Sequence, residues 1–281
     1  MTMSDTSAVS SSSAPPEAPL AKPSLMARAL ASPGLLPVGT FVAIIAVWEI
    51  SCHLFSIPSY ILPAPSRILG GFDSIDTSRW LAHVWGTLRV ALIGYFASIF
   101  VAIPIAIALA RSPVLSRAVY PILVVVQSTP VVAVAPIIIV ALGSGDLPRV
   151  VITCLITFFP LVVSTTTGLM ATPPELIELS RSLRAPVWRE ISQIRLPFAI
   201  PYIFSALKIS VTLAVIGAVV AEFVAADKGL GYFIQFSTSM FKVQQAWAGL
   251  VILVLMSLVL FQIVVAVQKI WFPWSLPKEK I

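Results

Sequence analysis

Six long stretches of this chain are nearly free of charged residues, and each is about twenty residues long. A helix needs roughly 20 apolar residues to cross a bilayer core of about 30 Å. The pattern therefore predicts an all-α polytopic membrane protein with about six transmembrane helices. The predicted spans are Gly34–Phe55, Thr87–Ala110, Val119–Leu142, Val150–Met170, Phe198–Glu222 and Ala246–Ile270.

One polar segment interrupts this pattern between the fourth and fifth spans. Six of the thirty charged residues of the chain fall within Glu178–Pro197. Thr172 and Glu175 have the T-x-x-E spacing of a capping box, so we expect a helix that begins at Pro173 with Thr172 as its N-cap. Leucines recur along it at three- and four-residue steps, which predicts a short amphipathic helix.

Two prolines shape the rest of this polar segment. Pro186 disfavours the helical conformation at the residue before it, so we expect a second short helix to start there. We expect Pro197 to end that helix before the fifth span. Such a pair of helices either lies along the lipid headgroups or docks a soluble partner, and its composition does not separate the two readings.

The basic residues indicate how the chain crosses the membrane. With the N-terminus in the cytoplasm, eleven Lys and Arg residues fall on the inner side and five on the outer side. This excess favours two cytoplasmic termini. We expect residues 1–33, rich in Ser, Ala and Pro, to form a disordered cytoplasmic tail. Residues 34–274 would form the membrane domain, with a cytoplasmic loop at 172–197, and residues 275–281 a C-terminal tail.

Composition narrows the class of protein further. A mean hydropathy of +0.98 and 58% hydrophobic residues are typical of a chain embedded in a lipid bilayer. The net charge is +6, but no basic tract interleaved with aromatic residues occurs, so nucleic acid is not an expected partner. Cys52 and Cys154 lie on different predicted spans, and no catalytic pair or metal-ligand spacing is present. We therefore expect no metal, no cofactor and no catalytic residue.

Polar residues within the spans are candidates for a substrate path, because burying them in lipid is costly. In the third span they precede Pro130, and their hydroxyl groups would alternatively satisfy carbonyl groups freed by a proline kink. In the fifth span, Lys208 and Glu222 lie within about 40° of one helix face. Alternatively, each of these two reaches water near a helix end. The candidates are Gln127, Ser128, Thr129, Ser205, Lys208, Thr212 and Glu222.

The polar segment resembles the EAA loop of binding-protein-dependent ABC importer permeases, whose pattern is E-A-A, three residues, G, nine residues and I-x-L-P. Glu178, Leu179 and Ser180 stand at the E-A-A positions, Arg184 at the glycine, and I-R-L-P closes the pattern at 194–197. The stretches ILPAPSRIL and AEFVAADKGLGYFI resemble permeases of the nitrate, sulfonate and taurine type. QSTPVVAVAP resembles permeases for heteroaromatic vitamins or their precursors.

The resemblance implies a permease subunit of the bacterial inner membrane that forms a homodimer with a second copy. It also implies an extracytoplasmic substrate-binding protein and two copies of a cytoplasmic ATP-binding subunit. The chain has no G-x-x-x-x-G-K-[ST] phosphate loop, so ATP hydrolysis is expected from that other subunit. The implied substrate is a small organic anion or a heteroaromatic compound, such as riboflavin or the pyrimidine half of thiamine. The implied coupling residues are Glu175, Glu178, Leu179, Ser182, Leu183, Arg184 and Ala185.

Arg184 departs from the family pattern, which has glycine at this position. If the turn there uses a left-handed backbone, a residue with a β-carbon costs about 1 kcal/mol relative to glycine. A long cation at this position would also add a contact to the ATP-binding subunit.

Two other classes of protein are alternatives. A self-contained secondary transporter or channel would show inverted repeats with matching broken helices, and the sequence has no convincing internal repeat. An intramembrane enzyme would need a metal-ligand cluster or paired catalytic groups, which the sequence lacks.

Overall fold

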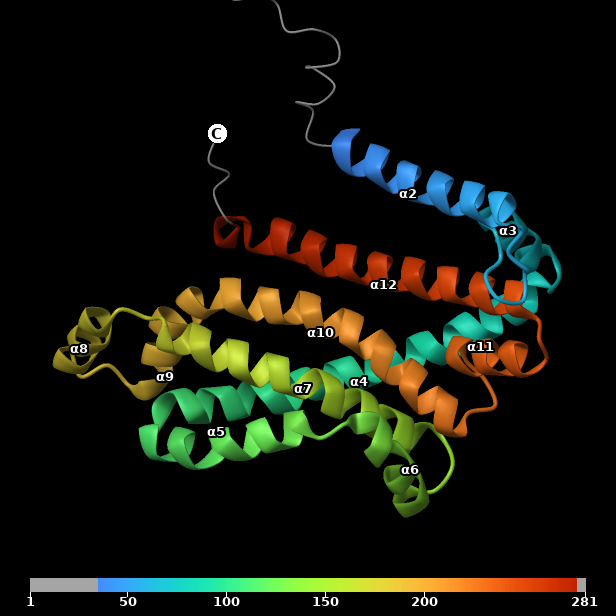
Figure 1. Cartoon of the computed structure of the whole chain (residues 1–281). Helices are drawn as coiled ribbons and strands as arrows, with labels where there is room; N and C mark the ends of the chain where they lie inside the picture. The colour runs from blue at the N-terminus through green and yellow to red at the C-terminus, as the bar shows by residue number, and fades with distance from the viewer. Residues whose placement is uncertain (1–34, 277–281) are drawn as a thin grey trace, which may run out of the picture. The chain divides into compact units, whose positions relative to one another are not determined.

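A computed structural model describes residues 35–276, and within this range it contains helices and loops but no strand (Figure 1). The chain divides into two units, one ending at Ser51 and the other beginning at Cys52. The described part of the first unit belongs to α2 (Leu35–Leu54), which is long and apolar enough to cross a membrane. The predicted tail 1–33 lies outside the described residues, as does most of the predicted tail 275–281.

The second unit is built from long helices joined by short ones. Its long helices lie side by side and run back and forth between two ends of the unit, with α8 at one end and α11 at the opposite end (Figure 1). We call these the α8 end and the α11 end. The elements are α3 (Pro65–Asp73), α4 (Thr77–Arg111), α5 (Pro113–Ser128), α6 (Val131–Leu142), α7 (Asp146–Met170), α8 (Pro174–Ser182), α9 (Val187–Arg189), a π-helix (Glu190–Arg195), α10 (Leu196–Ala225), α11 (Leu230–Ser239), α12 (Val243–Trp271) and a 3-10 turn (Pro273–Ser275).

The prediction of about six spans is confirmed, but the third span is not one helix. Within residues 35–276, five helical stretches are long and apolar enough to cross a membrane, and α5 with α6 makes a sixth only if the two count as one. They meet at an angle of 93°. Pro130 explains the break, because it lacks an N–H and forces Thr129 into an extended conformation, with φ −76° and ψ 124°.

Small residues let α4, α7 and α10 pack closely side by side (Figure 1). Thr153 of α7 lies between Gly94 of α4 and Gly217 of α10. A β-carbon on Gly94 would lie 2.6 Å from Thr153 Cβ, and one on Gly217 would lie 2.9 Å from Thr153 Cα. Lipid tails remove the hydrophobic drive for helix association, so close backbone contact of this kind supplies the packing energy instead.

Apolar side chains fill the space between these helices in two clusters. One cluster joins α4, α5, α7 and α10, and the other joins α6, α7 and α10. The first consists of Ala102, Leu109, Leu123, Leu161, Val162 and Ala206. The second consists of Ala135, Ile152 and Ala221.

Candidate functional site

The polar loop at 172–197 begins differently from the prediction. α8 starts at Pro174, with Pro173 at the N-cap position and no side-chain cap. The Thr172 hydroxyl donates a hydrogen bond to the carbonyl of Leu169, at 3.2 Å, and the residue is buried. The predicted capping box is therefore wrong, because Thr172 completes the end of α7 and does not begin α8.

The turn that ends α8 has the hydrogen bonds of a Schellman motif. Arg184 has a left-handed backbone, with φ +51°. The N–H of Ala185 donates to the carbonyl of Ser180 at 3.0 Å, and the N–H of Arg184 donates to the carbonyl of Arg181 at 2.9 Å. The position at which the family pattern has glycine is thus the position at which this chain needs a positive φ.

We expect the Arg184→Gly variant to strengthen this turn by about 1 kcal/mol, because glycine adopts a positive φ without the clash of a β-carbon. Hydrogen exchange by mass spectrometry should show slower exchange of the last turn of α8, by about fivefold. The matched control, Arg181→Gly, places glycine inside α8 and should accelerate the same exchange. Faster amide exchange of this turn in the Arg184→Gly variant would contradict the expected backbone strain at Arg184.

The loop presents apolar side chains to its surroundings next to charged ones. Leu179 is 56% exposed, Leu183 72% and Trp188 73%. Large exposed apolar side chains in a polar segment are typical of a binding surface. Of the seven predicted coupling residues, Ala185 is half-buried and the others are exposed: Glu175, Glu178, Leu179, Ser182, Leu183 and Arg184.

The helix expected after Pro186 forms at Val187, but Pro197 does not end it. The chain continues through the π-helix Glu190–Arg195 into α10, as one helical stretch from Val187 to Ala225. Pro197 lies where the chain changes from π-helix to α-helix, next to the i→i+5 hydrogen bond from the Leu196 N–H to the Ile191 carbonyl. A change of hydrogen-bond pattern displaces an N–H from the regular series, so a residue without one is tolerated there. The prediction of a helix end at Pro197 is therefore wrong.

The polar residues predicted in the third span gather at the break between α5 and α6. Gln127, Ser128 and Thr129 are exposed. The Ser128 hydroxyl donates to the carbonyl of Val124 at 2.8 Å, and Thr129 donates to that of Val125 at 3.0 Å. These two hydroxyls thus satisfy the carbonyls of their own helix, whereas the Gln127 amide has no hydrogen-bond partner among residues 35–276.

The polar residues predicted in the fifth span all lie on α10, and they differ in burial. Ser205 is exposed, and Lys208 and Thr212 are half-buried. The hydroxyls of Ser205 and Thr212 each donate to a carbonyl of the same helix. Glu222 lies near the other end of α10 and is only 1% exposed. The alternative reading that Glu222 reaches outer water is therefore wrong.

Glu222 holds the start of α11. Its Oε2 accepts the N–H of Gly231 at 2.7 Å and the Thr87 hydroxyl at 3.1 Å. The Thr87 oxygen in turn accepts the N–H of Leu230 at 2.7 Å. A carboxylate at a helix N-terminus also interacts favourably with the helix dipole. Gly229 has φ +126°, and a β-carbon on it would overlap the Glu222 carboxylate.

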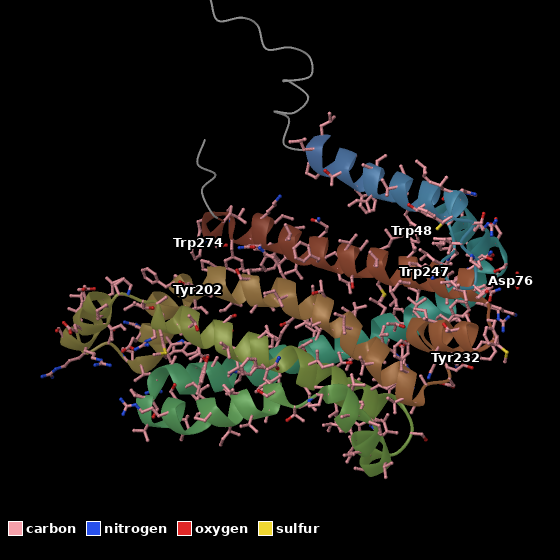
Figure 2. The ribbon with its side chains drawn as sticks, viewed as in Figure 1. Trp48, Asp76, Tyr202, Tyr232, Trp247 and Trp274 are labelled. Carbon is pink, nitrogen blue, oxygen red and sulfur yellow. The ribbon has the colours of Figure 1, made fainter. Side chains whose placement is uncertain are left out.

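Aromatic contacts support the same junction between α4 and α11. The His83 ring of α4 stacks on Tyr232 of α11, with ring centroids 6.4 Å apart. Figure 2 labels Tyr232. His83 Nδ1 accepts the N–H of Gly229 at 3.3 Å. Side chains of α4 and α10 therefore satisfy three successive N–H groups at the start of α11.

We expect the Glu222→Ala variant to lose about 2–4 kcal/mol of stability, because the buried Gly231 N–H and Thr87 hydroxyl lose their acceptor. Thermal unfolding of the purified protein in detergent should show a lower midpoint. Glu222→Gln keeps one acceptor oxygen and should lose less. Glu175→Ala, at an exposed position, should leave the midpoint unchanged. An unchanged midpoint in Glu222→Ala would rule out this role.

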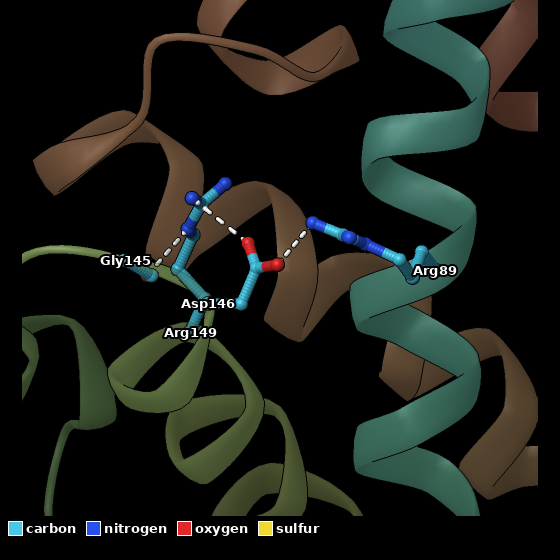
Figure 3. Close-up of polar contacts among 4 residues, drawn as sticks. All are labelled: Arg89, Gly145, Asp146 and Arg149. Atoms are coloured by element: carbon cyan, nitrogen blue, oxygen red, sulfur yellow. Dashed lines mark hydrogen bonds and ion pairs between the residues drawn. The ribbon is translucent and has the colours of Figure 1, made fainter.

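An ion-pair network at the α11 end was not predicted from the sequence. Asp146, at the start of α7, pairs with Arg89 of α4 (Figure 3). Asp146 Oδ1 also lies 3.0 Å from Nη2 of Arg149, whose Nε donates to the carbonyl of Gly145 at 2.9 Å. The local signal was the D-x-x-R spacing of Asp146 and Arg149. Arg89 lies on a distant helix, so no spacing in the sequence marked it as the partner of Asp146.

Comparisons with known proteins agree with this architecture. The family described as "Binding-protein-dependent transport system inner membrane component" matches residues 94–274. The formylaminopyrimidine transport permease protein ThiX of Halalkalibacterium halodurans is 33% identical over 85% of this chain and 96% of its own length. The riboflavin transport system permease protein RibX of Chloroflexus aurantiacus is 32% identical over 85% of this chain and 90% of its own.

A solved structure shares the fold. A chain of the MetNI methionine ABC transporter, in an inward-facing conformation, superposes with a TM-score of 0.58 at 24% identity. The superposition covers 66% of this chain and 94% of that one. The family match decides against a self-contained transporter and against an intramembrane enzyme. The chain therefore belongs to the family of inner membrane components of binding-protein-dependent transport systems, and it is a multi-pass permease subunit of an ABC importer, in which a separate subunit hydrolyses ATP.

Proposed function

We propose that this chain forms, with a second copy of itself, the membrane path of an importer for a small heteroaromatic compound that contains ring nitrogen. A binding protein outside the membrane delivers the compound, and two copies of a cytoplasmic ATP-binding subunit drive its passage. Both termini and the 172–197 loop lie in the cytoplasm. The excess of eleven basic residues over five on that side supports this orientation.

The geometry of the 172–197 loop carries the proposal that it docks on the ATP-binding subunit. α8 projects from the α8 end of the bundle (Figure 1) and exposes Leu179 and Leu183. Charged Glu175 and Glu178 flank these leucines on an exposed helix. An apolar strip with a charged margin fits a groove on a protein partner.

The two relatives described above support this substrate class. Formylaminopyrimidine and riboflavin both contain nitrogen heteroaromatic rings, and each relative matches this chain over nine-tenths or more of its own length. The stretch QSTPVVAVAP, which carries the sequence resemblance to such permeases, includes the break between α5 and α6. Small organic anions such as sulfonates are the second candidate class.

We propose that the substrate path passes the break between α5 and α6. The Gln127 amide is exposed there and lacks a hydrogen-bond partner among residues 35–276, so it is available to a polar ligand or to water. Ser128, Thr129, Ser205, Lys208 and Thr212 stay candidates for the same path. Glu222 is a weaker candidate, because its carboxylate already serves the N-terminus of α11.

Reconstitution into liposomes tests this function directly. The tagged chain should copurify with an ATP-binding subunit, and vesicles that also contain the binding protein should accumulate a labelled aminopyrimidine or riboflavin only with ATP. Replacing the phosphate-loop lysine of the ATP-binding subunit should abolish uptake. Uptake without that subunit would refute the proposal. Uptake of taurine in preference to both heteroaromatic compounds would refute the substrate class alone.

A further inference from the structure

The junction between the 172–197 loop and α10 contains a π-helix with a nearly buried ion pair. Glu190 and Arg195 are its first and last residues. Nε and Nη2 of Arg195 lie 2.8 Å and 2.7 Å from the same Oε1 of Glu190. The two side chains are only 10% and 14% exposed, so little water screens the pair.

The spacing of this pair distinguishes a π-helix from an α-helix. In an α-helix, residues five apart point about 140° away from each other. A π-helix forms i→i+5 hydrogen bonds, so the same two residues lie one above the other. The contact between Glu190 and Arg195 is therefore available in the π conformation and is lost in the α conformation.

Because of where the π-helix lies, a change from the π to the α conformation would alter the orientation of α8. The π-helix contacts α7, α8 and α10, and Ile191 within it is buried. The π-helix is the segment of chain that connects α8 and α9 to α10. Converting the π-helix to an α-helix would rotate α8 and α9 relative to α10 by about 100°, which is the rotation of one residue in an α-helix.

We propose that Glu190 and Arg195 are positioning residues, which hold the π conformation and so fix the angle at which α8 meets the ATP-binding subunit. This inference rests on the proposed docking of α8. Because the pair joins both sides of the junction, movement of α8 on ATP binding is passed to α10 and is not absorbed by a change of helical register.

Charge reversal tests the pair in the reconstituted importer. Glu190→Arg and Arg195→Glu each place two like charges together in a nearly buried site, and we expect each to lower the substrate transported per ATP hydrolysed by about tenfold or more. The double variant Glu190→Arg/Arg195→Glu restores opposite charges and should recover to within about threefold of the original ratio. Gln193→Ala is the matched control, because Gln193 lies exposed in the same π-helix, and it should leave the ratio unchanged.

A distance measurement separates positioning from stability alone. Spin labels at Arg181 on α8 and Tyr202 on α10, both exposed, report the angle between the loop and α10 when Cys52 and Cys154 are replaced by alanine. We expect each single reversal to broaden or shift the distance distribution and the double variant to restore it.

The outcomes separate this inference from the function on which it rests. Single reversals that keep the original transport per ATP, or a folded double variant that does not recover it, would overturn the ion-pair role. If a variant with a single charge reversal is not produced in the membrane, the transport per ATP of the double variant still tests the ion pair. Failure of the original chain to copurify with an ATP-binding subunit would instead overturn the proposed function.

Discussion

Ser182→Pro should abolish ATP-driven uptake while leaving the protein in the membrane. Ser182 is the last residue of α8, and a proline there removes an N–H from the final turn and clashes with the carbonyl of Glu178, four residues earlier, at a cost of about 3 kcal/mol. It also disfavours the helical conformation of Arg181, whose carbonyl accepts the Arg184 N–H of the Schellman turn. The spans themselves are untouched, so insertion should be normal.

The measurement compares uptake with ATP hydrolysis in vesicles that contain the complete importer. Ser182→Ala is the matched control, because alanine keeps the backbone N–H and favours the helix, and its uptake should equal that of the original chain. Normal uptake by Ser182→Pro would mean that α8 does not transmit the action of the ATP-binding subunit.

Gly94→Leu should prevent α4 and α7 from packing. Even the β-carbon of the new side chain would lie 2.5 Å from Cγ2 of Thr153 and 3.2 Å from the carbonyl of Val150. Thr153 cannot withdraw, since Gly217 of α10 approaches it from the other side. We expect a loss of about 3 kcal/mol or more, seen as a low yield of monodisperse protein and a lower midpoint of thermal unfolding.

Gly70→Leu provides the control for this substitution. Gly70 lies on α3, and a β-carbon there would meet no atom within 4 Å. The same change of residue at that position should therefore leave yield and midpoint unchanged. A Gly94→Leu variant that unfolds at the original temperature would show that α4 and α7 can separate without cost.

Hydropathy predicted the spans well because the cost of placing charge in lipid acts on every residue of a span. Predictions that depended on contacts from distant segments were less successful. Thr172 has the spacing of a capping residue, but it is buried at the end of α7 and bonds to Leu169. Glu222 lies on the same face of its helix as Lys208, which is what the sequence predicted. Its hydrogen-bond partners Thr87 and Gly231 belong to other helices, and the periodicity of one helix carries no information about them.

Local sequence also could not distinguish helical variants. A proline such as Pro197 usually marks a helix end, but here it lies where the π-helix changes to the α-helix, and the helical stretch continues through it. The pattern of Glu190 and Arg195, five residues apart and just before a proline, is the signal that was available. Only the contact between the two side chains in the structure shows that this spacing indicates a π-helix.

The break between α5 and α6 also bears on the fate of a copy made without its partners. α5 has 16 residues and is about 24 Å long, which is shorter than a bilayer core of about 30 Å. A single span made of α5 and α6 would therefore have its break within the membrane. Irregular backbone at that depth is tolerated only where protein or a water-filled cavity covers it, and Thr129 and Pro130 are exposed here. We therefore expect an orphan copy to be recognised by membrane quality control and degraded, so that cells must synthesise this subunit in step with its partners.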